Sequence, residues 1–308
     1  MSIPVTGLRP KKLKSAASTP SRGQFFQALP YLTPGTLGLV IFILGPLVAS
    51  LFISFTVWPM GGSPEFVGLQ NYARMIQDPV FWRVMFNTTL FAILYTAINL
   101  AFALGMATWL NRSVRFAGFF RVLFFLPVIT PGVANALIWQ LMLNPDGVVN
   151  ATLERIGLAP VGWLTNPVTA MGAIIVMTLW QAFGYNLIIL SAGLKAIPDS
   201  VYEAAAIDGA SPVQRFFKIT LPMVSPALFF CMIMTVIGSF KIFVQPYLLT
   251  LGGPGESTNM LVLYLYRNAF TYDRMGYASA LAWALFVLVM LVTALQFSQQ
   301  KRFVNYDV

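Results

Sequence analysis

Six apolar runs, each long enough to cross a bilayer as a helix, constrain this sequence more than any other feature. A hydrocarbon core of roughly 30 Å needs about 20 apolar residues in helical form. The runs lack the alternation, over segments of about ten residues, that marks an outer-membrane barrel, so helices remain as the spanning structures. The sequence predicts an all-α membrane protein with about six transmembrane helices, at residues 31–57, 84–110, 119–143, 169–194, 224–249 and 277–297.

The charged residues give these spans a direction. Only 9% of the chain is charged, whereas soluble domains average about 25%. Of the 19 basic residues, 13 lie in the N-terminal tail, in and just beyond the 111–118 turn, in the 195–223 segment and in the C-terminal tail. The connectors at 58–83, 144–168 and 250–276 hold five basic and six acidic residues. The positive-inside rule then predicts that both termini are cytoplasmic, and the net charge of +9 reflects topology, with no nucleic acid as partner.

The remaining composition limits the chemistry. Residues 1–28 are polar and basic, which predicts a disordered cytoplasmic tail before a membrane domain at 29–300 and a short tail at 301–308. The apolar run after the first tail is too long for a cleaved signal peptide. The chain has no histidine and one cysteine, Cys231, in an apolar run. We therefore expect no metal site, no catalytic residues and no intrachain disulfide.

The third run contains Pro127 and Pro131, which remove two backbone donors from one helix. A broken helix beside a cavity and an ordinary kink against a neighbouring helix are equally compatible with this pattern.

A polar stretch, EAAAIDGASPVQRFFKITLP, interrupts the chain between the fourth and fifth spans. Ser200 stands three residues before Glu203, the spacing of a capping box, and Gly209 stands where a short helix would end in a left-handed residue. Ser211 and Gln214 repeat the capping-box spacing. The pattern predicts two short cytoplasmic helices within about 199–218, joined by a tight turn.

The alanines after Glu203 offer two interpretations. Small side chains let another protein approach closely, but they also simply raise helix propensity while Glu203 completes the cap. The signature itself is long: Glu203, Ala204, Ala205, three residues, Gly209, nine residues, then Ile219, one residue, Leu221 and Pro222. It resembles the EAA motif of permease subunits of binding-protein-dependent ABC importers, in the cytoplasmic loop where that family has it.

Other stretches extend the resemblance over roughly residues 30–300. WQAFGYNLIILSAGLKAIPDSVYEAAAIDGA, TLGGPGEST and GYASALA are similar to the maltose-type, carbohydrate-importing branch. The resemblance implies a type I permease fold in a bacterial or archaeal cytoplasmic membrane, with the EAA helices docking on an ATPase. The ATPase-coupling residues would be Glu203, Ala204, Ala205, Gly209, Ser200 and Pro222.

The resemblance also implies partners. They are a second permease subunit, which the carbohydrate branch favours as a paralogue, an ABC ATPase dimer, an extracytoplasmic solute-binding protein, a small-molecule solute and membrane lipid. The chain contains no P-loop GxxxxGK[ST], so we expect no cofactor in this chain and assign ATP and Mg to the partner ATPase.

The family places the solute path on inner faces of the later spans. The candidates share amide, hydroxyl, aromatic or ammonium groups: Trp180, Gln181, Tyr185, Asn186, Ser239, Lys241 and Gln245. For the aromatic residues the alternative is an interfacial belt. Lys241 is the one ionisable residue clearly inside a span, which favours a functional site, although its stem would also let it reach the outer interface.

The solute class stays open. Related carbohydrate permeases often have aspartate where this chain has Val244. Lys241 without that aspartate nearby favours an anionic solute. A phosphorylated polyol such as glycerol-3-phosphate is therefore the alternative to a neutral sugar. From another class, an ion-coupled secondary transporter would need carboxylates within the spans, and all ten acidic residues lie in predicted loops or tails. A membrane scaffold would leave the capped loop and the polar span residues unexplained.

Overall fold

The computed structural model describes residues 22–59, 62–111 and 115–303. The chain divides into two compact units, one ending at Ser50 and the other beginning at Leu51. Most of the predicted N-terminal tail lies outside the described residues. The prediction that this tail extends to residue 28 is wrong, because the first helix begins at Arg22. The predicted C-terminal tail also starts too early, since the last helix continues to Phe303.

The described part of the first unit is one apolar helix, which continues past Ser50 to Ser54. It runs through α1 (Arg22–Leu39), a π-helical segment (Val40–Leu44) and α2 (Gly45–Ser54). Residues Ala28–Ser54 are long and apolar enough to cross a membrane. This helix ends three residues before the predicted boundary at Val57, which lies in a short strand.

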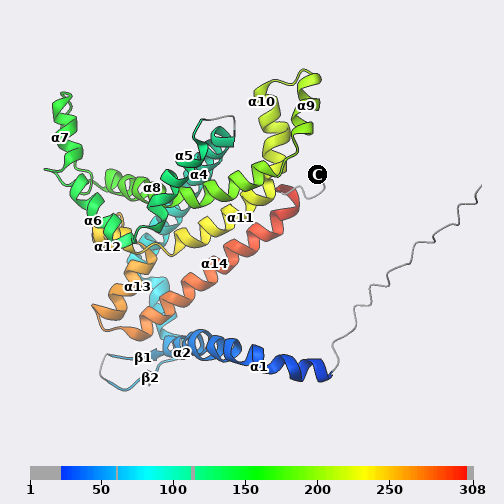
Figure 1. Ribbon diagram of the computed structural model, residues 1–308. Coiled ribbons are helices and arrows are strands. Elements are labelled where there is room, and N and C mark those ends of the chain that lie inside the picture. The colour runs from blue at the N-terminus through cyan, green and yellow to red at the C-terminus, as the bar shows by residue number, and fades with distance from the viewer. Residues whose placement is uncertain (1–21, 60–61, 112–114, 304–308) are drawn as a thin grey trace, which may run out of the picture. The chain divides into compact units, whose positions relative to one another are not determined.

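The second unit is almost entirely helical (Figure 1). Two two-residue strands, β1 (Thr56–Val57) and β2 (Glu65–Phe66), pair antiparallel near its start. The helices are α3 (Gln70–Gln77), α4 (Pro79–Asn111), α5 (Ala117–Ile129), α6 (Gly132–Leu143), α7 (Val148–Arg155), α8 (Pro167–Lys195), α9 (Asp199–Ile207), α10 (Pro212–Arg215), α11 (Leu221–Phe240), α12 (Val244–Leu249), α13 (Leu261–Phe270) and α14 (Met275–Phe303). Within the described residues, five helices, or six if the bent α5–α6 pair counts as one, pass the length and polarity test for a span.

Helices α4, α8 and α11 form the centre of this unit. At one level Phe91 and Tyr95 of α4 pack with Ile174 and Met177 of α8. At another level small and branched residues of the same helices meet, among them Ala107, Leu190 and Val224. The long helices are apolar on most faces, as expected for helices buried on one side and facing lipid on the other.

Close approach between α5 and α8 depends on one glycine. A Cβ on Gly184 would lie 2.1 Å from the carbonyl oxygen of Phe124, so no other residue fits without moving the backbone. Small residues at helix interfaces let membrane helices pack through backbone contact.

The third predicted span, 119–143, is a broken helix, which is one of the two possibilities that its prolines left open. Helix α5 ends at Ile129, α6 begins at Gly132, and the chain bends by 97° between them. Pro131 cannot donate a helical hydrogen bond and disfavours the α conformation at Thr130, whose ψ is 135°. The amide of Asn135 donates to the carbonyl of Pro127 at 3.5 Å, which partly satisfies the interrupted backbone.

The fifth span is also interrupted. Helix α11 ends at Phe240, and α12 resumes at Val244, so the predicted single run 224–249 is two helices. Before α11, residues Phe216–Thr220 form a π-helical segment that continues directly from α10.

Both π-helical segments precede a proline at the same spacing. The N–H of Gly45 donates to Val40, five residues back, and Pro46 follows. The N–H of Leu221 donates to Phe216, and Pro222 follows. Proline has no N–H and its ring presses on the carbonyl four residues earlier, so the preceding turn widens.

The connector helices α3 and α13 are tied to α14 through a half-buried carboxylate. Asp78 accepts hydrogen bonds from the hydroxyls of Tyr264 on α13 and Tyr277 on α14, the latter at 2.7 Å, and from the N–H of Val80 at 2.9 Å. Burial alone would raise the pKa of the Asp78 carboxyl, but these donors outweigh burial and hold the pKa below its ordinary value. Burial and the Asp78 contact raise the pKa of Tyr264 to about 12.

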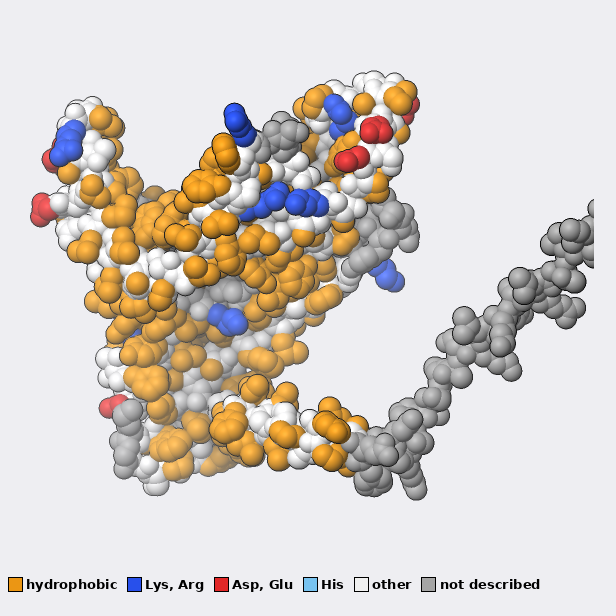
Figure 2. Space-filling view, in the orientation of Figure 1, with side chains coloured by type: hydrophobic (Ala, Val, Ile, Leu, Met, Phe, Trp, Pro, Cys, Tyr) orange, Lys and Arg blue, Asp and Glu red, His pale blue; other side chains and the backbone are white. Residues whose placement is uncertain are grey.

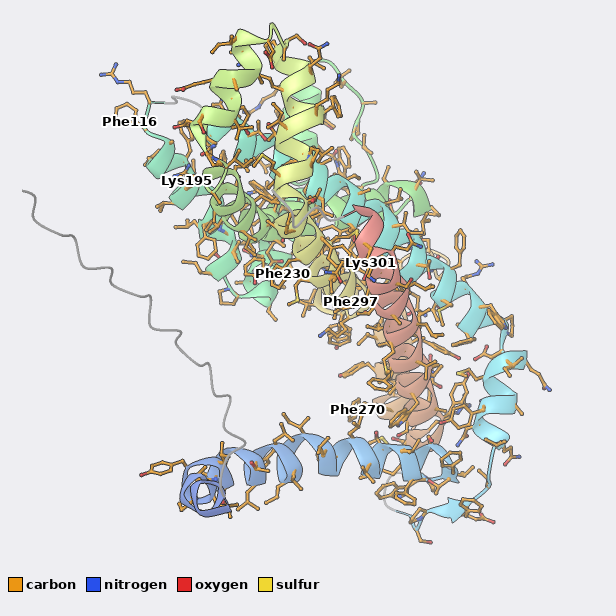
Figure 3. The ribbon with its side chains drawn as sticks, turned by 90° about the vertical axis from the view of Figure 1, so that its right-hand side faces the viewer. Phe116, Lys195, Phe230, Phe270, Phe297 and Lys301 are labelled. Carbon is orange, nitrogen blue, oxygen red and sulfur yellow. The ribbon has the colours of Figure 1, made fainter. Side chains whose placement is uncertain are left out.

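The ends of the helices sort into two groups. The C-terminal ends of α8 and α14 lie near the α9–α10 pair, whereas α12 and α13 lie at the other end of the spans (Figure 1). In Figure 3, Phe116 and Lys195 likewise lie at one end of the second unit and Phe270 at the opposite end. This grouping is the one that the alternation of charged connectors predicts.

Candidate functional site

A cavity of about 530 Å³ lies among α4, α8, α11 and α12, with the α5–α6 bend at its edge. Its wall contains six of the seven residues that the sequence selected for the solute path: Gln181, Tyr185, Asn186, Ser239, Lys241 and Gln245. The breaks in the third and fifth spans both border it, through Gly132 and Ile242. Irregular backbone at membrane depth is tolerated where it lines a cavity, so the breaks and the cavity belong together.

Two facing amides bring α8 and α12 together at this cavity. The Nε2 of Gln245 donates to the Oε1 of Gln181 at 3.2 Å. That bond does not use the Nε2 donors of Gln181 or the Oε1 acceptor of Gln245. The pair therefore presents both a donor and an acceptor, the combination that suits a sugar hydroxyl.

Asn186 lies in the cavity wall, but its side-chain amide forms hydrogen bonds with other residues of the protein. Its Nδ2 donates to the Oδ1 of Asn99 at 2.6 Å and to the Oγ1 of Thr235 at 2.8 Å. Asn99 also donates to the hydroxyl of Tyr95 at 3.2 Å. Asn186 is only 3% exposed, so its amide joins α4, α8 and α11 at the level of the cavity.

Lys241 caps the C-terminal end of α11. Its N–H donates to the carbonyl of Gly238 at 3.1 Å, and its side chain is exposed. Among the described residues that line the cavity, Lys241 is the only charged one. A cation here can pair with a negatively charged solute or donate to a neutral one.

Two of the predicted path residues, Ser239 and Trp180, direct their side chains to the protein itself. The hydroxyl of Ser239 donates to the carbonyl of Val236 in its own helix at 2.7 Å. Trp180 is outside the residues that line this cavity, and its ring packs on Trp139 with centroids 5.9 Å apart. The structure thus brings together every predicted path residue except Trp180.

Sequence reasoning missed the contribution of α4. Phe91 and Tyr95 line the cavity, and Asn99 anchors the polar network one turn further along. The signal was present, because Tyr95 and Asn99 are four residues apart and so share one face of an apolar helix.

A second feature is the α9–α10 loop, which projects from the end of α11 (Figure 1). Gly209 has φ of +76°, as predicted for the turn residue. The N–H of Ala210 donates to Ala205 at 2.9 Å and the N–H of Gly209 to Ala206 at 3.1 Å. These two bonds form a Schellman motif that ends α9 and reverses the chain.

One of the two predicted capping boxes is present. Ser211 Oγ accepts from the N–H of Gln214 at 3.3 Å, and Gln214 Oε1 accepts from the N–H of Ser211 at 2.8 Å. The prediction of a capping box at Ser200 and Glu203 is wrong. The N-cap of α9 is Pro198, with extended ψ of 137° and no side-chain cap, so Ser200 lies inside the first turn.

The outer face of this loop is open. Glu203 and Ala204 are exposed and Ala205 is half-buried. Ile207, at the end of α9, is 87% exposed. Figure 2 shows basic and acidic side chains gathered on the projecting pair, whereas hydrophobic side chains cover most of the visible surface of the spans. Pro222 is half-buried at the start of α11, below this surface.

The described residues contain no group of three or more His, Cys, Asp or Glu side chains that could hold a metal ion. Cys231 is buried in the α4–α8–α11 core and reaches no other thiol.

Comparison with known proteins agrees with this architecture. A probable ABC transporter permease of Bacillus subtilis, YesP, is 39% identical over 282 residues, covering 90% of this chain and 91% of that protein. The lactose transport permease LacF of Rhizobium radiobacter is 36% identical and covers 87% of this chain and 91% of that protein.

A solved bacterial ABC transporter that imports the acidic polysaccharide alginate contains a chain with the same fold. The TM-score is 0.82 at 22% identity, over 92% of this chain and 98% of that one. Residues 97–305 match the family described as the inner membrane component of binding-protein-dependent transport systems. The chain is therefore a multi-pass inner-membrane protein, and it belongs to this family of ABC importer permeases.

Proposed function

We propose that this chain is the permease subunit of an ATP-driven importer of a sugar or sugar-like solute, and that the cavity is part of its solute path. The observation that carries the proposal is the convergence of polar and aromatic side chains from four helices on one cavity of about 530 Å³. Amides bind sugar hydroxyls, and aromatic faces such as those of Phe91 and Tyr185 pack against sugar rings. The similarity to LacF, a lactose permease, supports a carbohydrate.

The α9–α10 loop is the proposed contact with a cytoplasmic ABC ATPase dimer. Exposed Ile207 lies beside exposed Glu203 and Ala204, and this combination of apolar, acidic and small side chains suits a partner's groove. ATP and Mg belong to that ATPase. Closure of the ATPase dimer would pull on α9 and turn the spans from an inward-facing to an outward-facing arrangement.

The other partners complete the path. A second permease subunit, a paralogue by analogy with carbohydrate importers, would supply the facing half. A solute-binding protein would deliver solute at the end where α12 and α13 lie. Both termini are then cytoplasmic, as the basic residues of the connectors favour.

The solute is tested first on the cognate binding protein. Thermal shift with a panel of mono- and disaccharides and sugar phosphates identifies the ligand, and uptake of that compound in labelled form follows. We expect Gln181→Ala and Gln245→Ala each to reduce uptake at least tenfold at equal membrane abundance. Gln77→Ala, an amide on α3 outside the cavity, is the matched control. Unchanged uptake in both cavity variants would contradict the proposed path.

The ATPase contact has its own test. Glu203→Lys reverses a charge on the docking face, and Gly209→Pro is incompatible with φ of +76°. Both variants are expected to lose co-purification with the ATPase while the membrane part elutes as a folded species. Co-purification that survives both changes would exclude the docking role.

A phosphorylated polyol such as glycerol-3-phosphate is the second candidate solute, favoured by Lys241 as the charged residue of the cavity wall. Competition uptake compares Lys241→Met with the parent chain. If the variant loses uptake of the phosphorylated compound selectively, the phosphorylated solute is supported. If the variant loses uptake of neutral sugars and phosphorylated polyols equally, that solute class is rejected.

The residues that line the cavity disfavour a function as an ion-coupled secondary transporter. None of the described acidic residues lines the cavity, so this chain offers no carboxylate there for a proton or sodium relay.

A further inference from the structure

The junction between α10 and α11 is a widened turn with a defined cause. The N–H of Leu221 donates to the carbonyl of Phe216, a π-type bond, and Pro222 follows immediately. Thr220 lies in this turn and is only 6% exposed. Its hydroxyl lies 3.4 Å from the carbonyl of Arg215, five residues back, as a weak hydrogen bond. The base of α11 thus departs from regular α geometry, as single π turns inside α-helices often do at functional sites.

One of those side chains comes from α9. The hydroxyl of Tyr202 lies 3.0 Å from the hydroxyl of Thr220. Tyr202 immediately precedes Glu203, and its ring packs with Phe216 against the core that α4, α8 and α11 share. The inner face of α9 is thus bonded to the base of α11, while its outer face is exposed.

A pocket lies beside the contact between Tyr202 and Thr220. This pocket, of about 660 Å³, separates α9 and α10 from the ends of α4 and α8, and its wall includes Tyr202, Thr220 and Asn111. Since a water molecule occupies about 30 Å³, this volume is large enough for α9 to tilt inward by displacing water. The pocket therefore leaves room for the angle between α9 and α11 to change.

We propose that the Tyr202–Thr220 pair is a clamp that makes α9 and α11 move as one rigid body, so that displacement of the loop reaches the fifth span. Tyr202 and Thr220 are positioning residues, because they act through the orientation of α9. The clamp rests on the proposed ATPase contact for its mechanical input. The clamp itself is a property of this chain and is measurable without the ATPase.

The direct test is a distance between α9 and α11. Spin labels at Ala206 and Phe230, both exposed, report it by pulsed electron paramagnetic resonance (Phe230 is labelled in Figure 3). Cys231→Ala removes the single native cysteine. In the labelled parent chain we expect a narrow distance distribution that is the same with and without a non-hydrolysable ATP analogue in the assembled importer.

The clamp variants remove hydroxyls without removing volume. Tyr202→Phe and Thr220→Val are expected to broaden the distribution in the full chain alone and to make it nucleotide-dependent in the importer. Thr220→Ser restores the hydroxyl and should restore the narrow distribution. Thr89→Val is the matched control, because the hydroxyl of Thr89 bonds to Met85 within α4 and, among the described residues, to no other helix.

A second measurement avoids labels and keeps the native cysteine. Hydrogen exchange of the α9 amides should accelerate about five- to tenfold in Thr220→Val, as the loss of roughly one net hydrogen bond predicts, and return to the parent rate in Thr220→Ser. Parent-like distributions and exchange in both clamp variants would overturn the proposal. So would a distance in the parent importer that changes with nucleotide.

These outcomes are separate from those of the proposed function. Loss of ATPase binding in the Glu203 and Gly209 variants tests docking. The clamp variants are expected to retain ATPase co-purification and to lose solute uptake per ATP hydrolysed.

Discussion

Replacing Asn186 by leucine separates structural from transport roles in the cavity wall. Leucine has the branched shape and the number of side-chain heavy atoms of asparagine, so the change deletes hydrogen bonds without opening a cavity. The bonds at 2.6 Å to Asn99 and 2.8 Å to Thr235 are lost together. Hydrogen bonds between membrane helices contribute about 0.6 kcal/mol on average and up to about 1.7 kcal/mol. The expected loss in the free energy of unfolding is therefore about 1–3 kcal/mol.

The assay is reversible unfolding of the purified chain in mixed micelles, followed by far-ultraviolet circular dichroism as SDS is increased. Gln181→Leu, one and a half turns earlier on α8, is the control, because its amide makes one longer bond at 3.2 Å and faces the cavity. It should change uptake with about 0.6 kcal/mol or less of destabilisation. If Asn186→Leu unfolds at the same SDS content as Gln181→Leu, the network does not hold α4, α8 and α11 together.

Three further changes test the fold. Gly184→Ala should destabilise the chain by about 1–3 kcal/mol through overpacking against α5, whereas Gly172→Ala, with no atom within 4 Å of its new Cβ, should not; thermal unfolding compares them. Asp78→Asn should lower Tm at neutral pH, because a carboxyl with a depressed pKa stabilises only while ionised. The difference should close as pH falls below the ordinary value of 3.8. Asn150→Asp should lower Tm and alter Trp163 fluorescence, since a carboxylate cannot donate to the two carbonyls that Asn150 Nδ2 contacts.

The sequence predicted what depends on length and local chemistry. Apolar runs located the spans, and the turn at Gly209 and the cap at Ser211 follow from φ and donor requirements of single residues. The prediction of a capping box at Ser200 is wrong because Pro198, two residues earlier, also marks a helix start. The structure begins α9 after Pro198, whose fixed φ suits the residue that precedes a helix.

The cavity was only partly predictable. Gln181 and Gln245 could be selected as polar residues in apolar runs, but their contact joins α8 to α12, which lies beyond the break after Phe240. The same break is invisible in hydropathy, since Ile242 and Phe243 continue the apolar pattern. Trp180 shares a span with the path residues, yet side-chain direction on a helix changes by about 100° per residue and takes it to Trp139 instead.

The π turn at Phe216–Thr220 lets the chain carry one extra residue between the α9–α10 loop and α11. In a regular α-helix, one residue more or fewer rotates everything before it by about 100° around the helix axis. The wider π turn instead takes up the extra residue within a single turn and keeps the helical bonds on either side in register. Deleting one residue within this turn should therefore leave the direction of the loop nearly unchanged, whereas deleting one residue within α11 should redirect the whole loop.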